Sequence, residues 1–196
     1  MLRPADYPAG VPGRGSYVAQ TGDGRAVGIV NVMGRVFMLG IDDPFAVVTR
    51  EIEAIRHRSR VIIVDFHAEA TSEKVAMGWH LDGKVTAVIG THTHVQTADE
   101  RILPNGTAYL SDAGMTGSHD SIIGMQIEPA LSRFLTGLPS KFEPAEGNKR
   151  LNGVIVEADE KTGRATGITR INYSEAELMN DEAVRPSLRG TAAGTR

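Results

Sequence analysis

The sequence predicts a mixed α/β fold in which buried strands alternate with helices. Apolar residues recur at steps of three and four after Pro44, which is typical of an amphipathic helix. Two short apolar runs, RVIIVDFH and KVTAVIG, then flank a second helical segment. Strand, helix and strand in succession imply a parallel pair with a right-handed crossover.

The composition is that of an ordinary globular protein with a small-molecule partner. The chain has 196 residues, of which 41% are hydrophobic and 23% charged, and its formal net charge is -3. This charge balance gives no electrostatic footprint for nucleic acid or for an anionic membrane. The absence of cysteine excludes disulfides and thiolate metal sites. Because the chain shows neither a secretory signal nor a run of membrane-spanning length, we expect it to be soluble and cytoplasmic.

The first third of the chain predicts a loop, a hairpin and a helix. Residues 1–14 are rich in Pro and Gly, as a surface loop is. SYVAQ (16–20) and RAVGIVNVM (25–33) flank the turn-forming TGDG, which indicates a hairpin. Asp43 and Pro44 then mark the start of the helix over 42–58.

The rest of the chain predicts further strands and helices within one domain, over 1–180, followed by a disordered tail over 181–196. The run at 60–67 is typical of a strand buried on both faces, and the next helix has Thr71 or Ser72 as its cap. The remaining elements are a helix over 70–83, strands over 84–90 and 107–112, a helix that starts near Pro129, and a late hairpin of 151–159 with 164–172.

Two histidines stand one residue apart where the strand 84–90 ends, in the stretch AVIGTHTHVQ. In a strand, side chains at positions i and i+2 point to the same face, so His92 and His94 can share one space. A pair of neutral imidazoles suits a divalent metal ion. Two polar residues in a loop after a strand are the competing interpretation.

A third histidine strengthens the metal hypothesis. His67 ends its own apolar run, so three of the six histidines fall at the carboxyl ends of neighbouring predicted strands. Open α/β sheets bind their ligands at this edge. Taken alone, His67 is better explained as a hydrogen-bonded, half-buried histidine. The three together favour a metal site.

Three further polar residues lie at the same predicted edge. Asp65 is two residues before His67 and is able to orient an imidazole, although a carboxylate bonded to backbone explains it as well. Asp112 ends the strand over 107–112, where a cap is its competing explanation. Asn31 is a weaker candidate of the same type. The histidines His57, His80 and His119 are assigned no chemistry.

Several motifs resemble those of a known family. LRPADYPAGVPGRG, NVMGR, DDPF, VDFHAEATSEK, GTHTHVQTADERILPNGTAYLSDAGMTG and GVIVEAD are similar, in order, to the bacterial calcineurin-like metallophosphoesterases of the YmdB type. The similarity runs from Leu2 to about Asn172.

The resemblance implies a dimetal phosphodiesterase that hydrolyses cyclic nucleotides such as 2′,3′-cyclic AMP. Its fold would be a two-sheet αββα sandwich flanked by helices. His67 and His92 match the ligands of one metal ion and His94 a ligand of the other, with Fe or Mn expected and Zn as the alternative. The two cations would hold the phosphate oxygens and neutralise developing charge.

Some motifs of the family are missing. Its members begin with a GDxxG-like aspartate, a GEN motif and a GNH motif whose histidine is the general acid, so no catalytic residue is assigned here. The chain therefore resembles the C-terminal part of such an enzyme. We expect weak metal binding and impaired hydrolysis, together with unpaired sheet edges that favour a homo-oligomer.

Two alternatives to this enzyme remain at the sequence level. A non-catalytic remnant or regulatory module would keep the fold without the reaction. An amidohydrolase also uses an HxH motif, but on the first strand of a barrel of about 250 residues, which this chain is too short to form.

Overall fold

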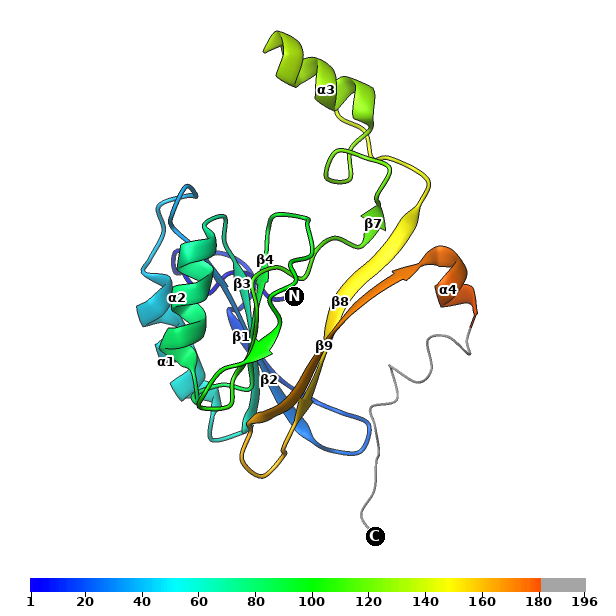
Figure 1. Cartoon of the computed structure of the whole chain (residues 1–196). Coiled ribbons are helices and arrows are strands. Elements are labelled where there is room, and N and C mark those ends of the chain that lie inside the picture. The colour runs from blue at the N-terminus through cyan, green and yellow to red at the C-terminus, as the bar shows by residue number, and fades with distance from the viewer. Residues whose placement is uncertain (181–196) are drawn as a thin grey trace. The chain divides into compact units, whose positions relative to one another are not determined.

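The computed structural model describes residues 1–180, which form two compact units (Figure 1). The first unit consists of Met1–His92, Thr97–Asp112 and Val156–Thr169. The second consists of Thr93–Gln96, Ala113–Ile155 and the described residues from Arg170 onward. The tail expected over 181–196 lies outside the described residues.

The first unit is built on a six-stranded sheet with the order β1-β2-β3-β4-β6-β5. Strands β2, β3, β4 and β6 are parallel, whereas β1 and β5 pair antiparallel at the two edges. The predicted hairpin of β1 with β2 and the predicted parallel pair of β3 with β4 are both confirmed. The strands are β1 (Ser16–Gln20), β2 (Ala26–Met33), β3 (Val61–His67), β4 (Ala87–Thr91), β5 (Arg101–Ile102) and β6 (Ala108–Leu110).

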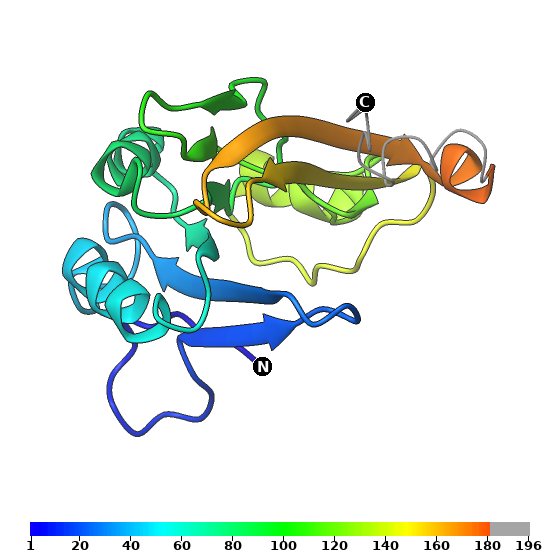
Figure 2. The ribbon, with the colours of Figure 1, turned by 90° about the horizontal axis from the view of Figure 1, so that it is seen from below.

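Two helices, α1 (Pro44–Ile55) and α2 (Thr71–Leu81), cover one face of this sheet (Figure 2). The side chain of Asp43 accepts a hydrogen bond from the backbone N–H of Phe45 and so caps α1, as the sequence indicates. The cap predicted for α2 is wrong. Its N-cap is Ala70, which makes no side-chain cap bond.

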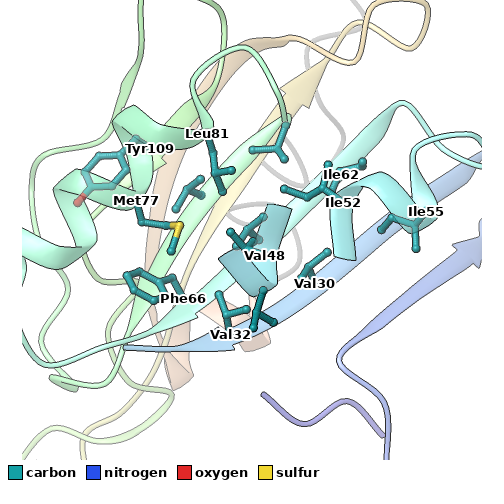
Figure 3. Close-up of a cluster of buried hydrophobic side chains, with 14 of the residues drawn as sticks. Val30, Val32, Val48, Ile52, Ile55, Ile62, Phe66, Met77, Leu81 and Tyr109 are labelled. Atoms are coloured by element: carbon teal, nitrogen blue, oxygen red, sulfur yellow. The ribbon is translucent and has the colours of Figure 1, made fainter. Parts of the chain in front are cut away.

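The hydrophobic core lies between these helices and the sheet (Figure 3). Side chains of β2 and β3 meet those of α1 and α2, and each is at most 6% exposed. Burying a side chain of this size contributes about 1.5–3 kcal/mol. The residues labelled in the close-up are Val30, Val32, Val48, Ile52, Ile55, Ile62, Phe66, Met77, Leu81 and Tyr109.

The two faces of β3 differ, which corrects the prediction that both are fully buried. Ile62, Val64 and Phe66 point into the core and are at most 1% exposed. The alternate positions, Asp65 and His67 among them, are only partly buried. Because apolar residues occupy both faces along most of β3, the sequence alone did not reveal this asymmetry.

The N-terminal loop is attached to the end of β2. Ala5 donates its backbone N–H to the carbonyl oxygen of Asn31. The fully buried carboxylate of Asp6 accepts a hydrogen bond from the N–H of Met33 at 3.0 Å. Burial raises the pKa of Asp6, and the Met33 hydrogen bond opposes that rise. Apart from the isolated bridge between Leu2 and Arg14, this segment is therefore held through its backbone and one carboxylate.

The second unit contains a three-stranded sheet with the order β7-β8-β9, in which β7 is antiparallel to β8. The predicted late hairpin is confirmed, since β8 and β9 are neighbours joined by a short turn. Helix α3 starts two residues before Pro129, because a proline in the first turn removes no intrahelical hydrogen bond. The elements are β7 (Gly117–Ser118), α3 (Ile127–Thr136), β8 (Lys149–Ala158), β9 (Ala165–Ser174) and α4 (Glu175–Met179), with β8 and β9 extending into the first unit.

The predicted α/β class is confirmed, with a mixed parallel and antiparallel sheet flanked by helices. None of the helices within residues 1–180 is both long enough and apolar enough to span a bilayer.

Candidate functional site

The site is built at the carboxyl ends of the parallel strands β2, β3 and β4. Asn31 on β2 lies opposite Asp65 on β3, and His67 lies opposite Thr91 on β4. Asp65 and His67 are two positions apart on the strand and so share its partly buried face. The fold therefore brings together three of the residues that the sequence singled out, namely Asn31, Asp65 and His67.

A chain of hydrogen bonds fixes the ring of His67. The side-chain amide of Asn31 donates to Asp65 Oδ2 at 2.7 Å, and the Thr91 hydroxyl donates to Asp65 Oδ1 at 3.0 Å. His67 Nδ1 lies 3.2 Å from the same hydroxyl oxygen. Since Thr91 donates its only hydroxyl proton to Asp65, His67 Nδ1 is the donor in this contact. The lone pair of His67 is then on Nε2, at the other side of the ring.

His92 faces that lone pair. Its Nδ1 lies 3.0 Å from His67 Nε2, and the two rings meet edge to face with centroids 4.8 Å apart. The other ring nitrogen of His92, Nε2, lies 2.9 Å from Glu69 Oε2. Burial, followed by the charge that His92 can carry, lowers the pKa of His67. With a lone pair on His67 Nε2 facing His92 Nδ1, the contact between the two nitrogens suits a proton or a cation.

The backbone that carries the HxH motif is strained. His92 has φ 121° and His94 has φ 65°, both in the region that non-glycine residues rarely adopt. Such conformations persist where the surrounding structure enforces them, and they concentrate at functional sites. Before them, Gly90 allows β4 to approach β6, because a Cβ there would lie 1.8 Å from the carbonyl oxygen of Ser111.

His94 belongs to the second unit. The side chain is exposed, and its Nδ1 lies 2.9 Å from the carbonyl oxygen of Ile123. A carbonyl only accepts, so Nδ1 carries the proton and the lone pair lies on Nε2. A carbonyl partner of this kind is common for metal-binding histidines, where it fixes the tautomer.

Asp112 is engaged elsewhere in the first unit. Its carboxylate accepts a hydrogen bond from the ammonium group of Lys74 at 2.8 Å, and both side chains are nearly inaccessible to solvent. The backbone N–H of Asp112 is also bonded to the Thr97 hydroxyl. The structure thus places Asp112 in a buried ion pair with Lys74, close enough to His67 that its charge favours protonation of that imidazole.

Sequence reasoning missed Glu69, Thr91 and Lys74. Glu69 was not among the predicted site residues, but its carboxylate contacts His92. The position of Glu69 in HAEATSEK, two residues after His67, could have indicated that it belongs to the site. Thr91 precedes the HxH motif and looked like an ordinary strand residue. Within residues 1–180, no group of three or more His, Cys, Asp or Glu side chains is arranged so that it could hold a metal ion.

The fold and the site define an α/β protein with imidazole and carboxylate groups gathered at the carboxyl ends of parallel strands, where open sheets of this class bind ligands. Comparison with known proteins narrows this class. The chain belongs to the family described as YmdB-like protein, which it matches over residues 1–171. The resemblance seen in the sequence motifs is therefore confirmed.

One curated relative and two solved structures illustrate the similarity. A 2′,3′-cyclic-nucleotide 2′-phosphodiesterase of Bacillus subtilis strain 168 is 48% identical over 183 residues, which are 93% of this chain and 66% of that protein. A crystal structure of a hypothetical protein from Thermus thermophilus has a TM-score of 0.82 at 44% identity, covering 89% of this chain and 67% of that one. A crystal structure of a novel phosphatase from Mycoplasma pneumoniae has a TM-score of 0.78 at 36% identity, covering 88% and 63%. The chain spans 58% to 66% of the length of three curated relatives.

Proposed function

We propose that this chain carries the histidine part of a metal-dependent phosphodiesterase site that acts on cyclic nucleotides such as 2′,3′-cyclic AMP. The observation that carries the proposal is the approach of His67 Nε2 to His92 Nδ1 at 3.0 Å. Hydrogen bonds fix this pair from both sides, through Thr91 on one and Glu69 on the other. The name of the Bacillus subtilis relative supports the substrate class.

The ring nitrogens of His67 and His92 are donors of the type that a divalent ion takes. Neutral imidazole nitrogens suit Zn, Fe and related ions, and ligating histidines usually donate their other ring N–H to a neighbouring acceptor. His67 meets this description, and His94 meets it within its own unit. We assign His67 and His92 to one ion and His94 to a second, with Fe or Mn expected and Zn as the alternative.

The bound ions would supply Lewis acidity and positive charge for the phosphate oxygens. The chain's own residues prepare the place. Asn31 and Asp65 hold the Thr91 hydroxyl, which fixes the tautomer and the orientation of His67. Glu69 places a negative charge against His92 and so offsets part of the charge of a cation there.

Affinity for metal is expected to be modest in this chain alone. His67 and His92 face each other already, but a further donor has to join them when an ion binds. Both residues assigned to this ion are neutral imidazoles, so its direct ligands would leave much of its charge uncompensated. Hydrolysis by this chain is accordingly expected to be slow.

Metal binding is the first test. Purified chain is titrated with Mn²⁺ and with Zn²⁺ by calorimetry, and the His92→Ala variant is compared with His57→Ala, in which an exposed histidine at the end of α1 is removed. The wild type and His57→Ala should bind alike, whereas His92→Ala should bind at least about tenfold more weakly. Equal affinities in all three proteins would refute the assignment of His92.

Activity is the second test. The same proteins are assayed on bis-p-nitrophenyl phosphate and on 2′,3′-cyclic AMP with Mn²⁺ or Fe²⁺. Slow turnover that depends on metal and disappears in His92→Ala supports the phosphodiesterase. Metal binding by His92 without any turnover would overturn the enzymatic part of the proposal in favour of a non-catalytic module.

A further inference from the structure

A cavity at the amino ends of β3 and β4, within the first unit, brings four cationic side chains together. It has a volume of about 550 Å³ and lies at the opposite end of β3 from His67, about 20 Å away along the strand. Three segments line it, namely the connection from α1 to β3, the turn after α2 and the turn between β8 and β9. We call it the basic cavity, and its four cations are Arg56, Arg58, Arg60 and Lys84.

These four side chains have no acidic partner in the part of the chain that the structure describes. None of them forms an ion pair there, and no carboxylate is among the described residues that line the cavity. Asp82 and Asp159, next to the two turns, accept hydrogen bonds from backbone N–H groups instead. Glu53, one turn before Arg56 on α1, lines an adjoining groove rather than the cavity. Because like charges repel, an anion in the cavity would be favoured.

The dipoles of α1 and α2 offset only part of this charge. Both helices end beside the cavity, and the C-terminus of a helix is equivalent to about half a negative elementary charge. The two helix ends together therefore offset about one of the four positive charges. Cations that complement helix dipoles are the structural explanation for this cluster, and that explanation leaves about three positive charges over.

The walls of the cavity are fixed by buried backbone contacts. Gly163 has φ 76°, and a Cβ there would lie 2.2 Å from the carbonyl oxygen of Arg60, so only glycine lets the β8–β9 turn approach β3 this closely. The fully buried hydroxyl of Thr86 donates to the carbonyl oxygen of Gly163 at 2.6 Å and accepts from the N–H of Ile62 at 3.0 Å. Arg60 Nη1 donates to the carbonyl oxygen of Lys161 at 3.0 Å. The three segments are thus held together before a ligand binds, which lowers the entropic cost of binding.

We propose that the basic cavity binds a small molecule with two linked phosphate groups, such as inorganic diphosphate or a nucleoside diphosphate. Guanidinium groups match phosphate oxygens through paired N–H donors, and an ammonium group adds a point charge. One phosphate group carries a charge of about -1.5 to -2, so two are needed to balance about three positive charges. The volume lies within the range of about 300–1,000 Å³ that is typical of small-molecule sites. The proposal is independent of the metal site and of the phosphodiesterase activity.

Calorimetric titration of the full chain with diphosphate, with ADP and with inorganic phosphate tests the proposal. EDTA is present, so that no metal ion at the histidines can hold the ligand. The wild type should bind diphosphate and ADP at least about tenfold more tightly than phosphate, and more weakly as the salt concentration rises. Failure to bind diphosphate, or equal affinity for phosphate, overturns the proposal.

Substitutions locate the bound diphosphate. Arg58→Gln and Lys84→Gln should each weaken binding about tenfold, because each removes a charge-assisted hydrogen bond. Arg50→Gln removes an exposed arginine of α1 that does not line the cavity and should bind as the wild type does. His92→Ala should also bind diphosphate normally, which separates this site from the histidine network. Equal affinities in Arg58→Gln, Lys84→Gln and Arg50→Gln would contradict the assignment.

Thermal denaturation gives a second and independent readout. Saturating diphosphate should raise the unfolding temperature of the wild type and of Arg50→Gln, because a ligand that binds the folded chain stabilises it. The double variant Arg58→Gln with Lys84→Gln should unfold near the wild-type temperature without ligand and gain little from diphosphate. A full gain in the double variant would place the ligand elsewhere. Tighter binding of a short single-stranded RNA without terminal phosphates than of diphosphate would assign the cations to a nucleic-acid backbone, and either result would overturn the proposal.

Discussion

Two polar networks of the first unit lie close to the carboxyl edge of the same sheet, and they differ in how completely they are closed. The Lys74–Asp112 pair joins opposite charges at 2.8 Å, with its side chains only 2% and 1% exposed. The His67–His92–Glu69 network is open to solvent, since His92 and Glu69 are 33% and 49% exposed. Both networks contain a carboxylate and a basic group, so composition alone does not separate them.

The difference separates a structural network from the proposed binding site. Within the Lys74–Asp112 pair, each charge already has its counter-ion and both side chains are almost completely buried. In the histidine network, the nitrogens of His67 and His92 face each other, and one proton or one cation is needed to join them. A polar group with an available lone pair at an accessible edge is a better candidate for function than a buried ion pair whose charges already neutralise each other.

The largest expected effect is on the buried Lys74–Asp112 pair. Lys74→Met removes the counter-ion of Asp112 and leaves a buried charge, which should lower the free energy of unfolding by about 3–5 kcal/mol. Urea denaturation measures this loss. The double variant Lys74→Met with Asp112→Leu removes both charges and should regain most of it. A loss below about 1 kcal/mol in the single variant would mean that the pair contributes no more than a surface salt bridge.

The second prediction concerns the solvent-accessible His67–His92–Glu69 network. Thr91→Val keeps the shape of the side chain but removes the hydroxyl between Asp65 and His67. Metal affinity should fall about 10- to 100-fold, because the orientation of His67 is lost. The free energy of unfolding should fall by only about 1 kcal/mol. Calorimetric titration and urea denaturation measure the two quantities on the same samples.

A matched control lies at the other end of β4. The Thr86 hydroxyl accepts from the N–H of Ile62 and donates to the carbonyl oxygen of Gly163. Thr86→Val should therefore reduce stability at least as much as Thr91→Val and leave metal affinity unchanged. If both variants lost metal affinity equally, the loss would follow from reduced stability of the fold, and Thr91 would have no role in positioning His67.

The sequence predicted the scaffold of the site well because that scaffold depends on local patterns. The apolar runs of β3 and β4 with a helix between them define a parallel pair, and parallel strands necessarily bring their carboxyl ends to one edge. His67 and His92 could thus be placed near each other without a structure. Asp65 followed from the two-residue period of a strand.

The remaining parts of the two networks depend on contacts that no local pattern encodes. Lys74 and Asp112 are 38 residues apart, and their pairing follows from how α2 packs on the sheet. The contact of Glu69 with His92 depends on the strained backbone that follows β4. The sequence therefore favoured Asp65 only slightly over Asp112 as a site residue, and the buried ion pair of Asp112 distinguishes them.

The smallest expected effect comes from His80, a histidine that belongs to neither network. It lies on α2 next to α1, where its Nε2 is 3.1 Å from the Thr49 hydroxyl. Burial, followed by the charge of Lys84, lowers the pKa of His80. The unfolded chain, in which a histidine has a pKa of about 6.5, then binds a proton more readily than the folded chain does. The contribution of His80 to stability is therefore complete above about pH 6.5 and is lost as the pH falls below that value.

His80→Gln should flatten this decline in the free energy of unfolding between pH 7.5 and 5.5, whereas the exposed-site control His57→Gln should leave it as steep as in the wild type. Metal affinity at pH 7.5 should be the same in the wild type and in both variants. His80 contacts Thr49 and Phe45, which do not belong to the histidine network of the sheet edge. A loss of metal affinity in His80→Gln would show that a partly buried histidine between the helices influences the edge of the sheet. Burial from solvent would then not be sufficient to distinguish structural from functional polar groups in this fold.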